Sequence, residues 1–515
     1  MGTAERQPEE TTAERAETLA DGILILLVLT VAQRGIGFLR AILFCRWLDA
    51  EQLGQWDMAF SFLMIAAPLS VMAISSSFRR YVEYYRQRGA LGPFLRRTSL
   101  AYCVLGCASV ALVAAASSPI SRLVFGTGAR SGLVVLMALS LAAVIAHHYF
   151  LDLCSALRNA RLLAALQMAN SIVFAVAGVV LLWLWRCDAS SVVIAYGLAC
   201  AVSAGIAMLA RGPAAEDPPG LPAAPARISV WPRILPFVAW ISLANFMAGM
   251  FDVADRYMII HYSGTAPEGA LAQIGVYHTC RVVPLLLVSV VAMVGSIVTP
   301  HLSHDWEAGR RSQVAARLQL LLKLFAFGLT AASVLVLFAA PLLFSVAFKG
   351  KFDGAMAVLP WTLVYCTWFA LFGLLQNYTW CCEKAHLATI TLFCGLVVNI
   401  GLNLVLLPRF GLLGAVLATA AANITALSAL AAVCRKWGLR LDRSCWVSVA
   451  LPVAVCLGPA LASLVLVAVS IEAAAGKFLL NESEKRSIFE GAGGYFGQVR
   501  RFFTARGKQV RATGQ

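Results

Sequence analysis

The chain has 515 residues, of which 60% are hydrophobic and 13% are charged, and its mean hydropathy is +0.78. A soluble domain carries about 25% charged residues, so the composition excludes an ordinary soluble protein and predicts an all-α polytopic membrane protein. In a soluble protein the net charge of +15 would suggest a nucleic-acid partner. Here the basic residues lie mostly in alternate loops, so no nucleic-acid partner is needed to explain them.

The predicted elements begin with residues 1–20, which are polar and acidic and lack an apolar core. We interpret them as a cytoplasmic tail rather than a signal peptide. Twelve apolar runs follow, six in 21–210 and six in 234–434, each long enough for a transmembrane helix. The Pro- and Gly-rich stretch 211–233 separates the two sets and predicts a cytoplasmic linker. The runs span residues 21–45, 57–77, 99–117, 132–152, 164–185, 192–210, 234–262, 275–299, 318–340, 358–381, 388–408 and 412–434.

The distribution of Lys and Arg predicts the orientation. With the N-terminus inside, 29 of the 41 basic residues fall in inner segments, 7 in outer loops and 5 within spans. This asymmetry follows the positive-inside rule and places the N-terminus in the cytoplasm. Four of the five basic residues within spans are arginines, which are considered below. The fifth is Lys323, which lies near an inner span end, and we expect its side chain to extend to the membrane surface.

A thirteenth apolar region, 444–474, is interrupted by Pro452 and by Gly458-Pro459. It predicts either a tight, partly re-entrant hairpin or one long span, so the total is 12–14 helices. The hairpin is preferred because it keeps the basic tail 475–515 in the cytoplasm. Within that tail, residues 494–503 predict an amphipathic helix on the inner membrane surface.

The two sets of six spans share a register. Gly54 opens the second span and Gly89 follows its end, and Gly275 and Gly309 hold the same places around the eighth span at almost the same interval. Because six is an even number, the repeat is parallel, with a pseudo-twofold axis along the membrane normal. The sequence thus predicts an N-lobe (21–210) and a C-lobe (234–434).

Six charged residues within the spans are the candidate functional residues. A charge at the centre of a membrane helix costs about 2.5–3.5 kcal/mol, and such residues usually mark a pathway or a site. Arg suits a phosphate ligand because its planar fork binds two oxygens and stays charged when buried. The candidates for substrate binding are Arg34, Arg281, Arg40 and Arg256, and the candidates for ion coupling or charge pairing are Asp252 and Asp255.

Several alternatives remain open for these residues. Asp252 and Arg256 are spaced i, i+4 and could neutralise each other while joining helices. The two acids could instead bind a coupling proton or cation, or pair with Arg256 and Arg281. We interpret His278 as a packing residue. The 14 Cys show no zinc-site or disulfide spacing, and no metal or cofactor is predicted.

Three stretches resemble a known family, the Wzx-type oligosaccharide and polysaccharide flippases. The family belongs to the superfamily that also contains the multidrug and toxic-compound extruders (MATE). The resemblance covers roughly residues 20–440, although Leu48-Asp49-Ala50 replaces the family's Leu-Gly-Pro. The stretches are FCRWLDAEQLGQW (44–56), IGVY (274–277) with VTPHLS (298–303), and NIGLNLVLLPRFGLLGA (399–415).

The resemblance implies a MATE-like fold of two six-helix lobes around a central cavity. It implies transport of an undecaprenyl-pyrophosphate-linked glycan across the bacterial inner membrane by alternating access, for lipopolysaccharide or exopolysaccharide synthesis. It further implies coupling to H⁺ or Na⁺ and partnership with a polysaccharide polymerase and export proteins.

Two other functions are open on the sequence. The first is an ion-coupled multidrug or metabolite antiporter, which is disfavoured because span-embedded Arg residues suit an anionic cargo. The second is a membrane glycan polymerase or ligase. Such an enzyme needs a large exterior loop to hold its acceptor, whereas even the longest exterior loop here, 341–357, is short. We therefore expect a transporter rather than an enzyme.

Overall fold

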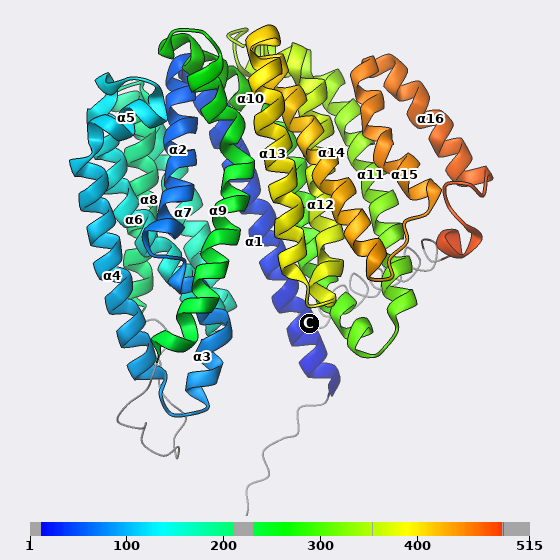
Figure 1. Cartoon of the computed structure of the whole chain (residues 1–515), viewed down its shortest axis with the longest axis horizontal. Coiled ribbons are helices and arrows are strands. Elements are labelled where there is room, and N and C mark those ends of the chain that lie inside the picture. The colour runs from blue at the N-terminus through cyan, green and yellow to red at the C-terminus, as the bar shows by residue number, and fades with distance from the viewer. Residues whose placement is uncertain (1–11, 211–229, 353, 487, 489–515) are drawn as a thin grey trace, which may run out of the picture. The chain divides into compact units, whose positions relative to one another are not determined.

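The structure is a computed structural model that describes residues 12–210, 230–352, 354–486 and 488. Within these residues the fold is all-helical and contains no strand (Figure 1). The chain divides into two compact units. The first comprises the described residues up to Leu286 with Ala340–Leu359 and Thr389–Ala422, and the second comprises Leu287–Ala339, Pro360–Ala388 and the described residues from Asn423. The all-α prediction is confirmed.

Eleven of the twelve predicted spans each correspond to a long helix, and the second, 57–77, corresponds to a bent pair. Among the described residues, 11 helices are long and apolar enough to cross a membrane, or 12 if the bent pair described below counts as one span. The α-helices are α1 (Thr12–Trp47), α2 (Ala50–Ser70), α3 (Phe78–Arg86), α4 (Leu91–Ala115), α5 (Ser117–Phe125), α6 (Ser131–Ala156), α7 (Ala160–Leu184), α8 (Ala189–Leu209), α9 (Trp231–Tyr262), α10 (Pro267–Glu307), α11 (Arg311–Leu342), α12 (Ala355–Cys381), α13 (Ala385–Phe410), α14 (Leu412–Lys436), α15 (Arg443–Ala450) and α16 (Pro459–Ala475).

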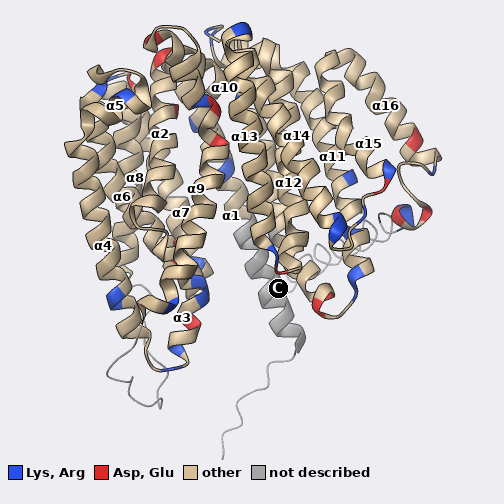
Figure 2. Ribbon diagram, viewed as in Figure 1, with Lys and Arg blue, Asp and Glu red and all other residues tan. Residues whose placement is uncertain are grey.

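Most charged residues lie near the ends of the helices, and the helix bodies are largely uncharged (Figure 2). Several helices begin where a side chain can satisfy the free amides of the first turn. Asp49 caps α2 by accepting a hydrogen bond from the Gln52 amide, and Asn159 and Asp188 cap α7 and α8 in the same way. The helices then extend past the predicted spans because the polar exits are themselves helical. In particular, α1 begins within the predicted tail 1–20, and α9 begins within the predicted linker 211–233.

The second predicted span, 57–77, is broken. α2 ends at Ser70, and Met72 and Ala73 both adopt left-handed backbone angles (φ +49° and +48°). The chain then continues through the 3₁₀ turn η1 (Ile74–Ser77) into α3, with a 61° bend. The conformation follows the helix-ending pattern in which the amides of residues 72 and 73 bond back to the carbonyls of Leu69 and Pro68. No Gly marks this break, so the sequence did not predict it.

Beyond the break, α3 is held against α6. Ser75 donates to the Asp152 carboxylate at 2.6 Å, and Arg79 forms an ion pair with the same carboxylate at 3.2 Å. Phe78, Tyr81 and Tyr85 are buried on the inner face of α3. α3 is therefore an amphipathic helix whose direction departs from that of the preceding span.

The apolar region 444–474 forms two pieces. α15 and the 3₁₀ segment η4 (Leu451–Leu457) make the first piece, and α16 makes the second. Gly458, at φ +92°, separates them, and Pro459 starts α16. Figure 1 shows the two pieces running in opposite directions. This is the geometry expected of a hairpin rather than of one continuous span.

The start of the predicted tail 475–515 packs against the second unit. Lys323 of α11 is buried and forms an ion pair with Glu484 at 2.8 Å. The expectation that Lys323 extends to the membrane surface is therefore wrong, because a carboxylate from beyond α16 reaches it instead. The amphipathic helix predicted for 494–503 lies outside the described residues.

Candidate functional site

The two glycines of the predicted repeat bring α2 and α10 together within the first unit. A Cβ atom on Gly54 would lie 1.9 Å from the carbonyl oxygen of Leu271, and a Cβ atom on Gly275 would lie 1.8 Å from that of Ala50. Neither position has room for a side chain, so the two helix starts are in backbone contact. This crossing places α2 beside the charged residues of α9 and α10.

Arg256 of α9 is paired with the first half of the chain. Its side chain is 5% exposed, and its Nε lies 2.8 Å from Asp57 Oδ2 on α2. The guanidinium also donates to Ser61 Oγ at 2.8 Å, one turn along α2. His278 of α10 places its Nδ1 2.8 Å from the other oxygen, Asp57 Oδ1. Asp57 is thus a buried carboxylate that joins α2, α9 and α10.

Arg281 of α10 has a different setting. It donates to Asp252 Oδ1 on α9 at 2.7 Å, and its Cζ lies 5.4 Å from the ring centroid of Tyr277. The Arg281 side chain is 7% exposed, whereas the Asp252 side chain is 55% exposed. The pairing of an acid of α9 with Arg281, one of the alternatives that the sequence left open, is therefore present. Asp252 does not pair with Arg256, because Asp57 and Ser61 surround that guanidinium.

Asp255 begins a buried polar network. Its Oδ2 accepts a hydrogen bond from Tyr277 at 2.5 Å and lies 3.5 Å from Thr419 Oγ1 on α14. Asn399 of α13 donates to Thr419 at 3.2 Å, and Asn403 donates to the Asn399 carbonyl at 2.9 Å. All five side chains are buried. The network links α9, α10, α13 and α14: two hydroxyl groups contact the Asp255 carboxylate, and the Asn residues of α13 connect to it through Thr419.

The two arginines of α1 have no such partners. Arg34 is exposed and makes no hydrogen bond or ion pair with the described residues. Arg40 is half-buried, and its Cζ lies 3.9 Å from the ring centroid of Phe174 on α7. Phe174 belongs to an aromatic cluster with Trp56 and Tyr196. Neither arginine forms an ion pair with a described carboxylate.

The structure therefore groups four of the six predicted site residues. Arg256, Arg281, Asp252 and Asp255 lie around the contact of α9 with α10, whereas Arg34 and Arg40 lie apart from them on α1. No group of His, Cys, Asp or Glu able to hold a metal ion occurs in the part of the chain that the structure describes.

Sequence reasoning missed Asp57, Ser61 and the role of His278. Asp57 stood at the predicted edge of a span, where a charge is unremarkable, and its partner Arg256 lies in the other half of the chain. One signal was available. Asp57 and Ser61 are spaced i, i+4, so they present two acceptors on one face of an apolar helix.

This architecture is that of a multi-pass, all-helical membrane protein with a MATE-like fold. It is similar to a solved structure of the lipid II flippase MurJ, with a TM-score of 0.67 and 14% identity, over 87% of this chain and 98% of that chain. It is also similar to a MATE-family multidrug resistance transporter, with a TM-score of 0.61 and 13% identity, over 77% and 95% of the two chains. A further match is a transporter of the same superfamily from Pyrococcus furiosus, with a TM-score of 0.58 and 13% identity, over 83% and 94%.

A family model also matches part of the sequence. Residues 19–213 match the sequence model of the family described as "Polysaccharide biosynthesis protein". A comparison with curated proteins found no match. The resemblance to polysaccharide flippases with a MATE-like fold is confirmed by the family match over 19–213 and by the fold over most of the chain.

Proposed function

We propose that this protein is a flippase that moves a polyprenyl-pyrophosphate-linked oligosaccharide across the bacterial inner membrane, for surface polysaccharide synthesis. The family match and the exporter fold support transport across a membrane. We propose alternating access between the lobes 21–210 and 234–434, with both termini in the cytoplasm. A polymerase and export proteins would act on the cargo after it is flipped.

The proposal rests mainly on two arginines of α1 that have no described carboxylate partner. Arg34 and Arg40 are two cations within one membrane helix, and no described carboxylate neutralises either of them. Isolated cations at this depth are costly and are retained where they act on a ligand. Their planar guanidinium groups suit the oxygens of a pyrophosphate. Arg256 and Arg281 would assist from α9 and α10, once their acid partners release them.

We also propose that Asp255 is the residue that binds the coupling ion. Asp252 neutralises Arg281 and is exposed, whereas Asp255 is buried and accepts hydrogen bonds from the hydroxyls of Tyr277 and Thr419. Such a site can accept a proton or a small cation such as Na⁺. Replacement of Asp255 by Asn should abolish the dependence of transport on the ion gradient while leaving binding of the cargo in place.

The proposal is tested by Arg34→Ala and Arg34→Lys in cells that depend on this protein for surface polysaccharide. Export should be lost in Arg34→Ala and partly retained in Arg34→Lys, with unchanged amounts of protein in the membrane. Arg409→Ala is the matched control, because Arg409 is also exposed but lies in the last turn of α13. Normal export by both Arg34→Ala and Arg281→Ala would refute an anionic cargo.

The second candidate function is an ion-coupled antiporter for drugs or metabolites. It is supported by the likeness to a MATE-family structure and by the Asp255 network. The same cells distinguish the two functions, because an antiporter would leave polysaccharide export intact and would instead change resistance to cationic compounds.

A further inference from the structure

The amphipathic helix α3 and the start of α9 together hold two arginines on one tyrosine ring. The Cζ atom of Arg88 lies 3.6 Å from the ring centroid of Tyr84, and that of Arg233 lies 4.0 Å from the same centroid. The two Cζ atoms are therefore no farther apart than the sum of these two distances. Arg233 also donates a short hydrogen bond to the Tyr84 hydroxyl, and Arg88 donates to the Tyr84 carbonyl at 3.1 Å.

These cations have no acidic partner in the part of the chain that the structure describes. The carboxylates of Glu83 and Asp152 pair with other arginines of α3. Arg80, Arg88 and Arg233 form no ion pair with a carboxylate among the described residues. Like charges held this close repel each other, so an anion between them would relieve the repulsion. Figure 2 shows basic residues gathered on α3 and the adjoining end of α9.

The site continues into an apolar face. Arg233, Phe237 and Trp240 follow each other at i, i+4 and i+7, so they lie on one face of α9. Arg80 lies over the ring of Phe237 at 5.0 Å, and Trp240 is 48% exposed. Cationic side chains beside an apolar stripe suit an amphiphile with an anionic head group, because a soluble anion would make no use of the apolar stripe.

We propose that Arg88, Arg233 and Tyr84 form a binding site for the phosphate of a membrane lipid, with the lipid chain along the Phe237–Trp240 face of α9. The ligand class is a phosphate-bearing lipid of net negative charge, such as phosphatidylglycerol or a polyprenyl phosphate. The guanidinium forks bind the phosphate oxygens, and the tyrosine ring fixes their spacing. The site is separate from the arginines within the spans and does not depend on the identity of the cargo.

The test measures binding of short-chain fluorescent lipids to the full-length protein in neutral detergent. Phosphatidylglycerol is compared with phosphatidylcholine, whose head carries no net charge, and with undecaprenyl phosphate; inorganic pyrophosphate is added as a competitor. Arg88→Gln and Arg233→Gln should each weaken binding of both anionic lipids about tenfold, the loss expected for one charge-assisted hydrogen-bonding partner. Binding of phosphatidylcholine should not change.

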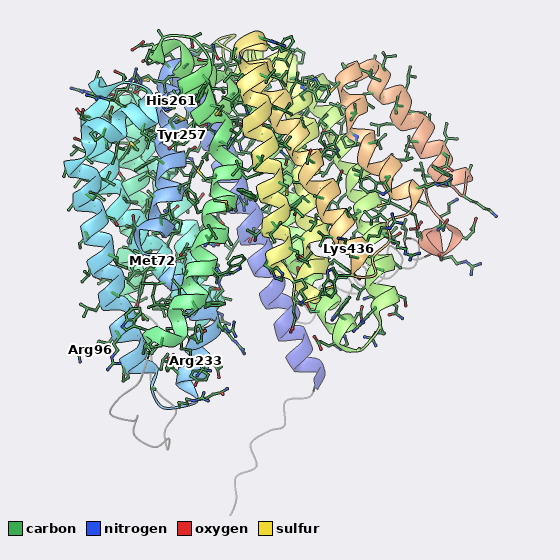
Figure 3. All side chains as sticks on the ribbon, viewed as in Figure 1. Met72, Arg96, Arg233, Tyr257, His261 and Lys436 are labelled. Carbon is green, nitrogen blue, oxygen red and sulfur yellow. The ribbon has the colours of Figure 1, made fainter. Side chains whose placement is uncertain are left out.

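Arg96→Gln is the matched control, because Arg96 is exposed on α4 at the same end of the first unit as Arg233 (Figure 3) and its replacement removes the same charge. It should stay within about twofold of the parent protein. Arg88→Lys and Arg233→Lys keep the charge without the planar fork and should give intermediate affinity, which separates ligand contact from a folding defect.

Equal affinities for Arg88→Gln, Arg233→Gln and Arg96→Gln would overturn the proposal. Displacement of the lipids by equimolar pyrophosphate would overturn the assignment to a lipid phosphate, because a soluble anion would then suffice. Neither outcome bears on the proposed flippase function, since no sugar-linked cargo and no export are measured.

Discussion

The membrane-depth arginines of this protein fall into two regions with opposite surroundings. On α9 and α10, Arg256 and Arg281 are buried and each faces a carboxylate, Asp57 and Asp252 respectively. On α1, Arg34 is exposed and Arg40 faces the ring of Phe174. The residue type is the same, and the difference lies in whether the protein supplies the counter-charge. We predict that the paired arginines contribute mainly to structure until their acid partners release them, whereas the arginines of α1, which have no carboxylate partner among the described residues, can bind an external anion directly.

The largest expected effect concerns the buried pair. Asp57→Asn should lower the free energy of unfolding by about 3–5 kcal/mol, because it leaves Arg256 buried without a counter-charge. Thermal unfolding of the purified protein in detergent measures this. The double variant Asp57→Leu/Arg256→Met should recover most of the loss, since neither charge then remains. Asp252→Asn is the comparison, and its effect should be smaller, because solvent screens the Asp252 carboxylate, which is 55% exposed. Equal losses for Asp57→Asn and Asp252→Asn would contradict this prediction.

The next effect concerns the crossing that brings Asp57 to its partners. Gly275→Ala places a methyl group within 1.8 Å of the Ala50 carbonyl oxygen and should cost about 1–3 kcal/mol by overpacking. Gly269→Ala on the same helix is the control, because its nearest neighbour would lie at an ordinary 3.6 Å. The same unfolding assay measures both. A Gly275→Ala protein as stable as Gly269→Ala would mean that α2 and α10 are not in backbone contact.

A smaller effect is expected for Arg40. Arg40→Gln removes a cation from the face of Phe174 and should cost about 1 kcal/mol. Phe174→Leu provides the second side of a double-mutant cycle, and the coupling between the two substitutions should be about as large as the loss from Arg40→Gln. Additive losses would show that the ring does not hold the guanidinium.

The smallest effect on stability is expected for Arg34, and it separates the arginines of α1 most clearly from the paired arginines of α9 and α10. Arg34→Gln should change the free energy of unfolding by no more than about 0.5 kcal/mol, because Arg34 is exposed and contacts no described polar group. Export of polysaccharide should nevertheless fall at least tenfold. A loss of stability as large as that of Asp57→Asn would place Arg34 among the structural residues.

Much of the fold could be predicted because hydrophobic runs and basic loops are local properties of the sequence. All twelve runs became helices, and Gly458-Pro459 marked the break before α16. The bend after α2 escaped prediction because Met72 and Ala73 carry no turn signature, although both adopt left-handed angles. Local pattern cannot report a conformation that is held by distant contacts, such as those of Asp152 with η1 and α3.

Of the site, only the charged residues that lie inside apolar spans could be predicted. A charge inside an apolar run is visible in one sequence, so Arg281 and Asp255 could be named as candidates. Which charges pair is a matter of tertiary contact, and the i, i+4 spacing of Asp252 and Arg256 suggested a partner that Asp57 displaces. His278 showed no sign of its contact with Asp57 until α2 and α10 were brought together.

The contact of Gly54 and Gly275 has a consequence for the ancestry of the chain. These are the positions that the predicted internal repeat would make equivalent, and each lies against the backbone of the other half. After a duplication, most positions of two copies can drift independently, but these two cannot accept a side chain unless the opposite copy retreats. We therefore predict that a chimaera that joins one half to the matching half of a distant relative should fail first at this crossing.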